Sequence, residues 1–284
     1  MVNSNLGIRL TERIRAINQL STRFVAKVDS CMARCLPGCC PLCRAPLQTR
    51  DALVCRHGPI CERCYVSLPF NRQACERCAE PLVMYASQGC ASWADEIAGS
   101  ASRLCGRCLT RPPAFMATRA PLLYRGEVRT LMQRFKFDGD RRSGQMLLSV
   151  FLQAESIHEA MGHGNEATSH LPEALVAVPL HCGRARQRGF NQAHWLATRL
   201  ADRLGIPLMV AQRKRDDLSQ RKLTRAGRQR NLRGAFEVSG SLPRHIALVD
   251  DVMTTGATLD SLARACRRAG AKRIEAWVMA RTPR

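Results

Sequence analysis

Apolar residues in the second half of the chain follow the periods of strands and helices in turn. The four consecutive apolar residues at 246–249 predict a strand that is buried on both faces, as in a parallel sheet. Two further strands are expected at 175–179 and 273–280. Helical spacing predicts helices at about 191–204 and 259–269. This alternation indicates an α/β domain built on a parallel sheet.

The strand at 246–249 runs into two adjacent acids and a turn of small residues, Asp250-Asp251-Val-Met-Thr254-Thr255-Gly256-Ala257-Thr258. Small residues let the backbone approach a ligand, and the N–H groups at a helix start attract anions because they lack intrahelical partners. Ionised carboxylates only accept hydrogen bonds, which suits the hydroxyls of a ribose. The segment therefore indicates a site for a ribose with a 5′-phosphate. The alternative is a surface turn in which Asp251 or Thr254 caps the helix, which leaves the second acid unexplained.

Eight of the fifteen cysteines form Cys-x-x-Cys pairs, at Cys40/Cys43, Cys61/Cys64, Cys75/Cys78 and Cys105/Cys108. Two sulfurs at this spacing can hold the same tetrahedral ion, and two pairs complete a closed structural zinc site. Eight thiolates therefore predict two four-cysteine zinc sites, although the spacing leaves open which pairs combine.

A redox role is the rival interpretation, because Cys-x-x-Cys also serves thioredoxin-like chemistry. That chemistry needs one pair at a helix start after a strand. Here the pairs lie among prolines and polar residues, which suits short loops that hold a metal. Zinc is favoured, and its binding would supply much of the folding free energy of this loop-rich region.

These patterns divide the 284 residues into three parts. We expect an N-terminal helical extension at 1–38, a cysteine-rich zinc-binding module at 39–110 and an α/β domain at 111–284. No apolar run of 18 residues occurs, which argues against a membrane span, and the N-terminus lacks the apolar stretch of a secretory signal. A cytoplasmic protein is expected.

Basic residues gather in two segments. Arg184 and Arg188 follow the strand at 175–179, and arginines at the carboxyl end of a strand can bind pyrophosphate through forked hydrogen bonds, although a solvated basic turn is the alternative. The chain carries a net charge of +21, and residues 213–233 hold nine Arg or Lys. Such clusters favour nucleic acid or serve an adjacent pyrophosphate site. The candidates for nucleic-acid contact are Arg213, Lys214, Arg221, Lys222, Arg225 and Arg228.

The 250–258 segment closely resembles the signature of type I phosphoribosyltransferases, except that Thr255 stands where many members have a second glycine. A longer set of motifs resembles the ComF/GntX family over residues 39–282. These motifs are Cys-Pro-Leu-Cys at 40–43, Cys-Gly-Arg-Cys at 105–108, Phe-Lys-Phe at 135–137, Pro179-Leu180, Arg-Gly-Phe-Asn-Gln at 188–192, Arg230-Asn231, Gly-Ala-Phe at 234–236 and the 249–258 segment.

This resemblance implies a zinc module joined to a type I phosphoribosyltransferase-like domain, in which helices cover both faces of a parallel sheet. Its ligand would be phosphoribosyl pyrophosphate, held by Asp250, Asp251 and the 254–258 turn. Mg²⁺ would accompany that ligand, since hard oxygen ligands favour it. The family also implies a role in natural competence, with incoming single-stranded DNA and proteins of the competence machinery as partners.

Two functions remain open on the sequence alone. The first is a competence protein that binds phosphoribosyl pyrophosphate and handles single-stranded DNA. The second is a catalytically active phosphoribosyltransferase of nucleotide or small-molecule metabolism without a DNA role. The intact acids Asp250 and Asp251 favour turnover, whereas the basic segment and the zinc module favour DNA.

Overall fold

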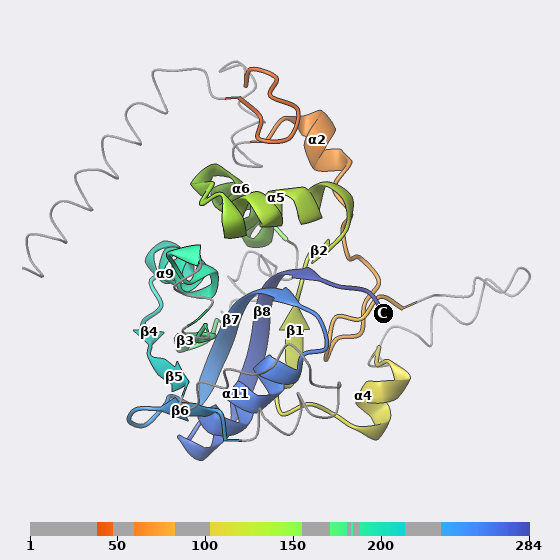
Figure 1. The fold of residues 1–284 in the computed structure, drawn as a ribbon. Coiled ribbons are helices and arrows are strands. Elements are labelled where there is room, and N and C mark those ends of the chain that lie inside the picture. Colours follow the sequence, from red (N-terminus) through yellow and green to blue (C-terminus); the bar gives the residue numbers. More distant parts are fainter. Residues whose placement is uncertain are drawn as a thin grey trace, which may run out of the picture.

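The computed structural model of the chain describes residues 39–47, 60–82, 103–154, 171–180, 183, 188–213 and 234–284. Figure 1 shows a twisted sheet at the centre of these residues, with helices on either side. The N-terminal helical extension expected at 1–38 lies outside the described residues.

The central sheet is parallel throughout. Its strands are β1 (Ala117–Arg119), β2 (Leu122–Leu123), β3 (Ala174–Ala177), β4 (Leu208–Met209), β7 (His245–Met253) and β8 (Arg273–Arg281). They lie in the order β1-β8-β7-β3-β4, and β2 pairs with the end of β8. The pairing of β7 with β8 is the longest, and it runs in register from His245 opposite Arg273 to Met253 opposite Arg281.

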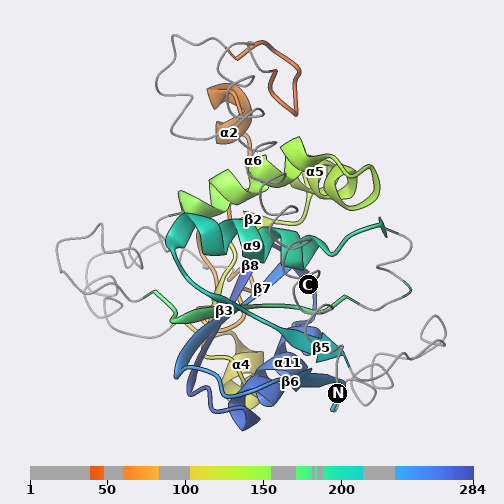
Figure 2. The same cartoon turned by 90° about the vertical axis from the view of Figure 1, so that its left-hand side faces the viewer.

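Helices cover both faces of this sheet (Figure 2). One face carries α5 (Gly126–Phe137), α6 (Arg141–Leu152) and α9 (Gln192–Leu204). The other carries α11 (Ala257–Arg268) and the antiparallel pair β5 (Ala211–Arg213) and β6 (Phe236–Val238). The short helices α2 (Glu62–Val66) and α4 (Gly106–Thr110) belong to the cysteine-rich part of the chain. The predicted fold class, a parallel sheet between helical layers with a cysteine-rich region before it, is confirmed.

The apolar run in β7 is explained by burial on both sides. Ala247 and Val249 pack in the cluster formed with α5, α6 and α9, whereas Ile246 and Leu248 pack in the cluster formed with α11. Successive side chains of a strand point to opposite faces, so a strand covered on both sides needs apolar residues at every position.

Two crossover connections leave the middle of the sheet, where β3 and β7 are neighbours, and run toward opposite edges. From β3 it passes through α9 to β4 on one side, and from β7 it passes through α11 to β8 on the other. Right-handed crossovers in opposite directions put their helices on opposite faces, so the strand order reverses between β3 and β7. In open α/β sheets, ligands bind at this switch point.

The cysteine-rich segments lie against the α/β domain at two separate places. Cys40, Ile60 and Leu68 are buried in the same cluster as α5 and α6. Farther along, Phe70 forms a bridge with Leu122 of β2, and the chain then follows that edge of the sheet. Helices α2 and α4 consequently lie at opposite ends of the molecule (Figures 1 and 2).

Close packing of α5 on α6 depends on Gly144. A Cβ atom at this position would lie 2.6 Å from the ring of Phe135, which is itself fully buried and cannot move aside. We expect Gly144→Ala to lower the free energy of unfolding by about 1–3 kcal/mol, as overpacking of a core does. Urea unfolding measures this loss. Gly106→Ala is the control, because its Cβ would meet nothing within 4 Å, and an equal loss there would contradict the packing argument.

Candidate functional site

Asp250 and Asp251 lie near the carboxyl end of β7, at the switch point of the sheet. The backbone N–H of Asp251 donates to Oδ1 of Asp250 at 2.9 Å. Nζ of Lys136 lies 3.0 Å from Oδ2 of Asp251, and both side chains are mostly buried. One acid is therefore held by the backbone and the other by a cation.

The segment Phe135-Lys136-Phe137 ends α5 and serves three purposes. The buried ring of Phe135 meets the rings of Phe190 and Trp195 edge-on, with centroids 5.5 and 5.2 Å away, which fixes the end of the helix. Lys136 pairs with Asp251. The Phe137 ring is exposed, and the Arg188 guanidinium lies 5.1 Å above it.

Gln192 joins the two cations of the site. Its side-chain amide donates to the carbonyl of Lys136 at 3.5 Å, and its Oε1 accepts from Nη1 of Arg188 at 3.2 Å. Lys136, near the end of α5, thus contacts Asp251, and Arg188, four residues before α9, acts on Asp250 through its charge.

Burial and the neighbouring charge of Asp251 together raise the pKa of Asp250 to about 7, against the opposing effects of the Asp251 N–H, Lys136 and Arg188. A pair of adjacent carboxylates disfavours double ionisation. Asp250 therefore gains and loses its proton near neutral pH, and hydrogen-bonding or cationic partners at the site favour its charged form.

The 254–258 turn connects these acids to α11. Gly256 is the N-cap residue of α11 and has a φ of +77°, a conformation that glycine adopts without strain. Because this residue has no side chain, the alternative in which Asp251 or Thr254 caps the helix is wrong. Thr254 and Thr255 are exposed, and the start of the 12-residue helix α11 follows them. Such a helix start offers N–H groups to an anion.

The structure thus brings together Asp250, Asp251, Arg188 and the turn from Thr254 to Thr258. Arg184 lies outside the described residues, as do Lys214, Arg221, Lys222, Arg225 and Arg228. Arg213 ends β5, with its guanidinium 5.7 Å from the ring centre of Phe236. Lys136 was not predicted as a site residue. Its only signal was the Phe-Lys-Phe motif, because nothing near it in sequence indicates a carboxylate partner.

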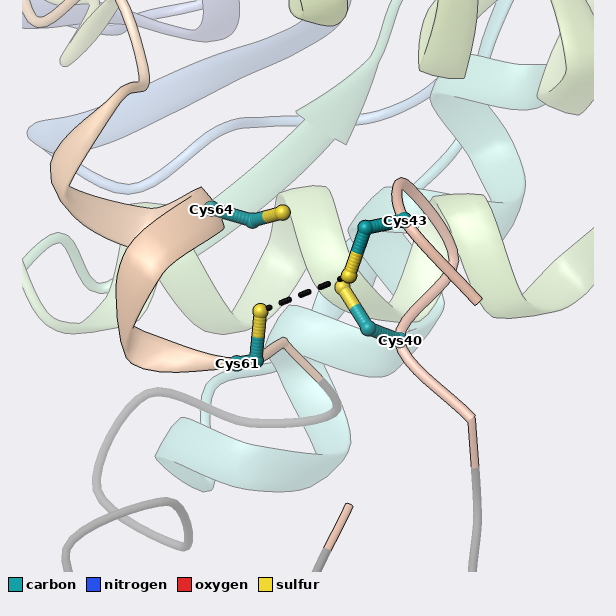
Figure 3. A group of neighbouring side chains, drawn as sticks. All are labelled: Cys40, Cys43, Cys61 and Cys64. Carbon is teal, nitrogen blue, oxygen red and sulfur yellow. Dashed lines mark hydrogen bonds between the residues drawn. The ribbon is translucent and has the colours of Figure 1, made fainter. Parts of the chain in front are cut away.

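The eight cysteines of the Cys-x-x-Cys pairs form two groups, each with all four sulfurs within 4.8 Å of one another. The first group is Cys40, Cys43, Cys61 and Cys64, and the second is Cys75, Cys78, Cys105 and Cys108. Figure 3 shows the four side chains of the first group pointing toward one another. Neighbouring pairs along the chain therefore combine.

Both groups repeat one local structure. In the first, the Cys40 N–H donates to Ala45 O and the Arg44 N–H to Cys40 O, each at 2.8 Å. In the second, the Cys75 N–H donates to Glu80 O at 2.8 Å and the Ala79 N–H to Cys75 O at 2.7 Å. Arg44 and Ala79 both have positive φ, of 60° and 53°. Each turn is completed by a Cys-x-x-Cys pair at a helix start, with Cys61 as N-cap of α2 and Cys105 as N-cap of α4.

These groups fit a tetrahedral metal ion. Between the pairs, the sulfurs of Cys43 and Cys61 and those of Cys78 and Cys105 are 3.6 Å apart, and all eight thiols are free. A disulfide would need about 2.05 Å. Zinc–sulfur bonds of about 2.3 Å in a tetrahedron separate the sulfurs by about 3.8 Å. Each group could therefore hold a structural zinc ion.

Comparisons with known proteins agree with this geometry. The phosphoribosyl transferase domain family matches residues 191–284. Competence protein F of Haemophilus influenzae is 31% identical over 231 residues, which cover 78% of this chain and 88% of that protein. The chain belongs to the ComF/GntX family. The DNA utilization protein YhgH of Escherichia coli K12 is 32% identical over 253 residues, 87% of this chain and 98% of that protein.

A more distant member of the ComF/GntX family is competence protein ComFC of Streptococcus pneumoniae. It is 25% identical over 250 residues, which cover 85% of this chain and 99% of that protein. The similarity therefore extends over both the cysteine-rich region and the phosphoribosyltransferase-like domain, and such relatives support a role in competence. None of the helices among the described residues has the length and apolar character needed to cross a bilayer.

The raised pKa of Asp250 has a consequence for stability. The folded protein keeps a proton on Asp250 between about pH 4 and pH 7 that the unfolded chain has lost, so this residue lowers stability as pH rises through that range. We expect Asp250→Asn to raise the melting temperature by about 2–4 °C at pH 8, with no gain at pH 4. Calorimetric scans at the two pH values measure the difference.

Asp251→Asn is the matched control, because it breaks the pair with Lys136. It should lower the melting temperature at pH 8, since it leaves a mostly buried cation without its partner. A stabilising effect of both variants, or of neither, would contradict the assigned environments.

Proposed function

We propose that this protein binds phosphoribosyl pyrophosphate at the β7–α11 junction and acts in natural competence on incoming single-stranded DNA. One observation supports the proposed ligand most strongly. Two carboxylates, two cations and a helix start lie together at the switch point of the sheet. Hydroxyl-binding, pyrophosphate-binding and phosphate-binding groups lie together there, and this ligand carries all three kinds of partner.

Each part of the ligand has a candidate partner. Asp250 and Asp251 accept hydrogen bonds from the ribose hydroxyls, because ionised carboxylates are acceptors. The N–H groups of the 254–258 turn and the first turn of α11 bind the 5′-phosphate. Arg188, together with Arg184, binds the pyrophosphate through charge-assisted hydrogen bonds.

Magnesium fits this arrangement, because carboxylate and phosphate oxygens are the ligands it prefers. When bound with the ligand, it would supply positive charge to the pyrophosphate. Lys136 holds Asp251 in place, and a magnesium ion bound beside Asp250 would favour the ionised form of that carboxylate and lower its raised pKa.

Catalytic phosphoribosyl transfer is the second candidate, and the intact pair Asp250–Asp251 favours it. In such a step a nitrogen nucleophile attacks the anomeric carbon, the bond from that carbon to the pyrophosphate oxygen breaks, and pyrophosphate leaves with the electron pair. Arg188 would stabilise the charge that develops on the leaving group. We assign no residue as the base that prepares the nucleophile.

The DNA half of the proposal rests on charge and on the relatives. The net charge is +21, with nine cations at 213–233, and the similar proteins are named for competence and for DNA utilization. Cations at this density bind a phosphate backbone and release its counterions.

Calorimetric titration with phosphoribosyl pyrophosphate and Mg²⁺ tests the ligand. We expect the wild type to bind and Asp250→Ala/Asp251→Ala to bind at least about 100-fold more weakly, since each charged hydrogen bond contributes about 1.5–3 kcal/mol. Asp202→Ala, an exposed acid on α9, is the control and should bind like the wild type. Equal binding by the double mutant would overturn the assignment of the two acids.

Binding of a single-stranded oligonucleotide at several salt concentrations tests the DNA role. We expect the logarithm of affinity to fall linearly with the logarithm of salt, with a slope of about −0.7 for each phosphate neutralised. Replacing Arg221, Lys222 and Arg225 with Gln should make that slope shallower, whereas Asp250→Ala/Asp251→Ala should leave it unchanged. No binding, or an affinity that does not change with salt, would favour the metabolic enzyme.

A further inference from the structure

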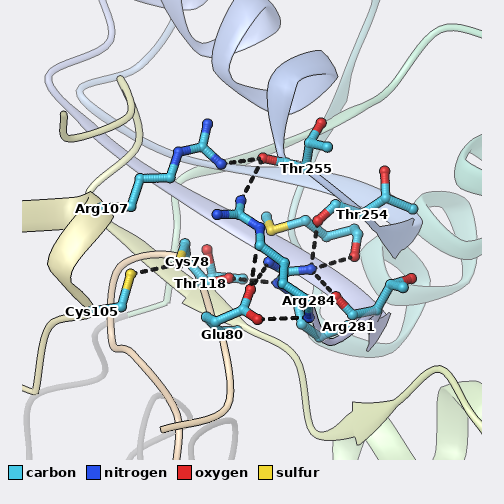
Figure 4. Close-up of polar contacts among 12 residues, drawn as sticks. Cys78, Glu80, Cys105, Arg107, Thr118, Thr254, Thr255, Arg281 and Arg284 are labelled. Carbon is cyan, nitrogen blue, oxygen red and sulfur yellow. Dashed lines mark hydrogen bonds and ion pairs between the residues drawn. The ribbon is translucent and has the colours of Figure 1, made fainter. Parts of the chain in front are cut away.

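The guanidinium of Arg281 is fully buried between the second cysteine group and the 254–258 turn. On one side its Nε donates to the carbonyl of Cys78 at 3.0 Å. On the other, its Nη1 donates to the carbonyls of Met253 at 3.2 Å and of Thr254 at 2.5 Å. Its charge is neutralised by Glu80, two residues after Cys78. Figure 4 shows these residues converging.

Two further arginines reach the next carbonyl of the turn. Arg107 lies between Cys105 and Cys108 on α4, and its Nη1 donates to Thr255 O at 3.3 Å. Arg284 donates to the same carbonyl at 3.4 Å through Nη2, and its backbone N–H donates to Oε1 of Glu80 at 2.8 Å. Three consecutive carbonyls of the turn are therefore held from the side of the second cysteine group (Figure 4).

Because each peptide bond is planar, the direction of these three carbonyls also fixes the direction of the N–H groups that follow them. In a trans peptide, the C=O of one residue and the N–H of the next point in opposite directions. Carbonyls of Met253, Thr254 and Thr255 that face the arginines therefore turn the N–H groups of Thr254, Thr255 and Gly256 away from them. Successive N–H groups presented in this way form an anion-binding concavity.

We infer that the second cysteine group positions the 254–258 turn, so that metal in this group and phosphate in the turn bind cooperatively. Arg281 and Arg107 are the positioning residues, since they contact backbone of the turn and lie within or against the metal-binding structure. This inference rests on the proposed function, because it takes the turn to be the phosphate site.

The first cysteine group supplies the comparison within the same chain. It lies over α5 and α6, where Arg134 of α5 donates to the carbonyl of Pro41 at 2.8 Å. Its four-cysteine structure repeats that of the second group, but among the described residues its contacts are with the helical layer rather than with the turn. Loss of metal here should leave the turn in place.

The test compares Cys105→Ser/Cys108→Ser with Cys40→Ser/Cys43→Ser in the full chain, with zinc measured by elemental analysis. Both should lose one zinc per chain. We expect the affinity for phosphoribosyl pyrophosphate with Mg²⁺ to fall at least about tenfold in the first variant, because several of the N–H contacts to phosphate are lost, and less than about twofold in the second. Hydrogen exchange of the 253–258 backbone should rise only in the first. Equal affinity and equal exchange would overturn the inference.

An arginine pair keeps the test decisive if a cysteine variant does not fold. Arg107→Ala removes a contact to the turn, whereas Arg103→Ala removes the exposed pair with Glu76 in the same group. We expect about threefold weaker binding for Arg107→Ala, in keeping with one exposed hydrogen bond, and no change for Arg103→Ala. Identical affinities in the two variants would count against the positioning role.

Thermodynamic linkage between the two binding sites allows the cooperativity to be measured on the wild-type protein. If metal strengthens phosphate binding, phosphate must strengthen metal binding by the same factor. Phosphoribosyl pyrophosphate should therefore slow the loss of one zinc to a chelator and leave the other unaffected, and unchanged release of both would contradict coupling. Absence of ligand binding by the zinc-loaded wild type would instead overturn the proposed function itself.

Discussion

A fully buried guanidinium, that of Arg281, is the constraint on which the arrangement of this molecule depends. Burying a charge is costly unless it is paired and hydrogen-bonded. Arg281 meets this need with Glu80 and with carbonyls from three segments, at Cys78, at Met253 and Thr254, and at Thr282. It thereby joins the cysteine-rich region to the end of β8 and to the turn after β7. Two parts of the chain that look independent in sequence share one polar core.

The candidate site is assembled by parallel-sheet geometry. All the strands of the central sheet run the same way, so their carboxyl ends lie at one edge. The acids lie near the carboxyl end of β7, and Arg188 precedes α9. Lys136 lies in the last turn of α5, on the same face of the sheet as α9. Gly256 is the N-cap residue of α11 and has no side chain, the Ala257 N–H donates to Oγ1 of Thr255 at 3.4 Å, and the start of this helix offers its N–H groups to an anion. The function proposed for the site follows from this meeting of charges.

Sequence patterns predicted much of this arrangement. The apolar run at 246–249, buried on both faces, predicted β7, and the acids with the small-residue turn predicted a ligand site after it, whose ligand stays a prediction. Helices α5 and α6 escaped because the buried strand before them, β2, has only two residues and gives no apolar run in the sequence. Lys136 escaped because its partner, Asp251, lies 115 residues away in sequence. The pairing of cysteines was open because spacing fixes which sulfurs can form a pair but not which pairs meet. Arg281 was not predicted as a buried residue, because the expected strand ended at 280 and the burial of its charge depends on Glu80, which lies far away in sequence.

A crystal structure of the zinc-loaded protein with phosphoribosyl pyrophosphate and Mg²⁺ would test the central claim most directly. The account predicts the 5′-phosphate against the N–H groups of the 254–258 turn, on the side opposite Arg281 and Arg107. It also predicts the ribose hydroxyls on Asp250 and Asp251. Ligand bound elsewhere in the chain, or phosphate on the arginine side of the turn, would contradict it.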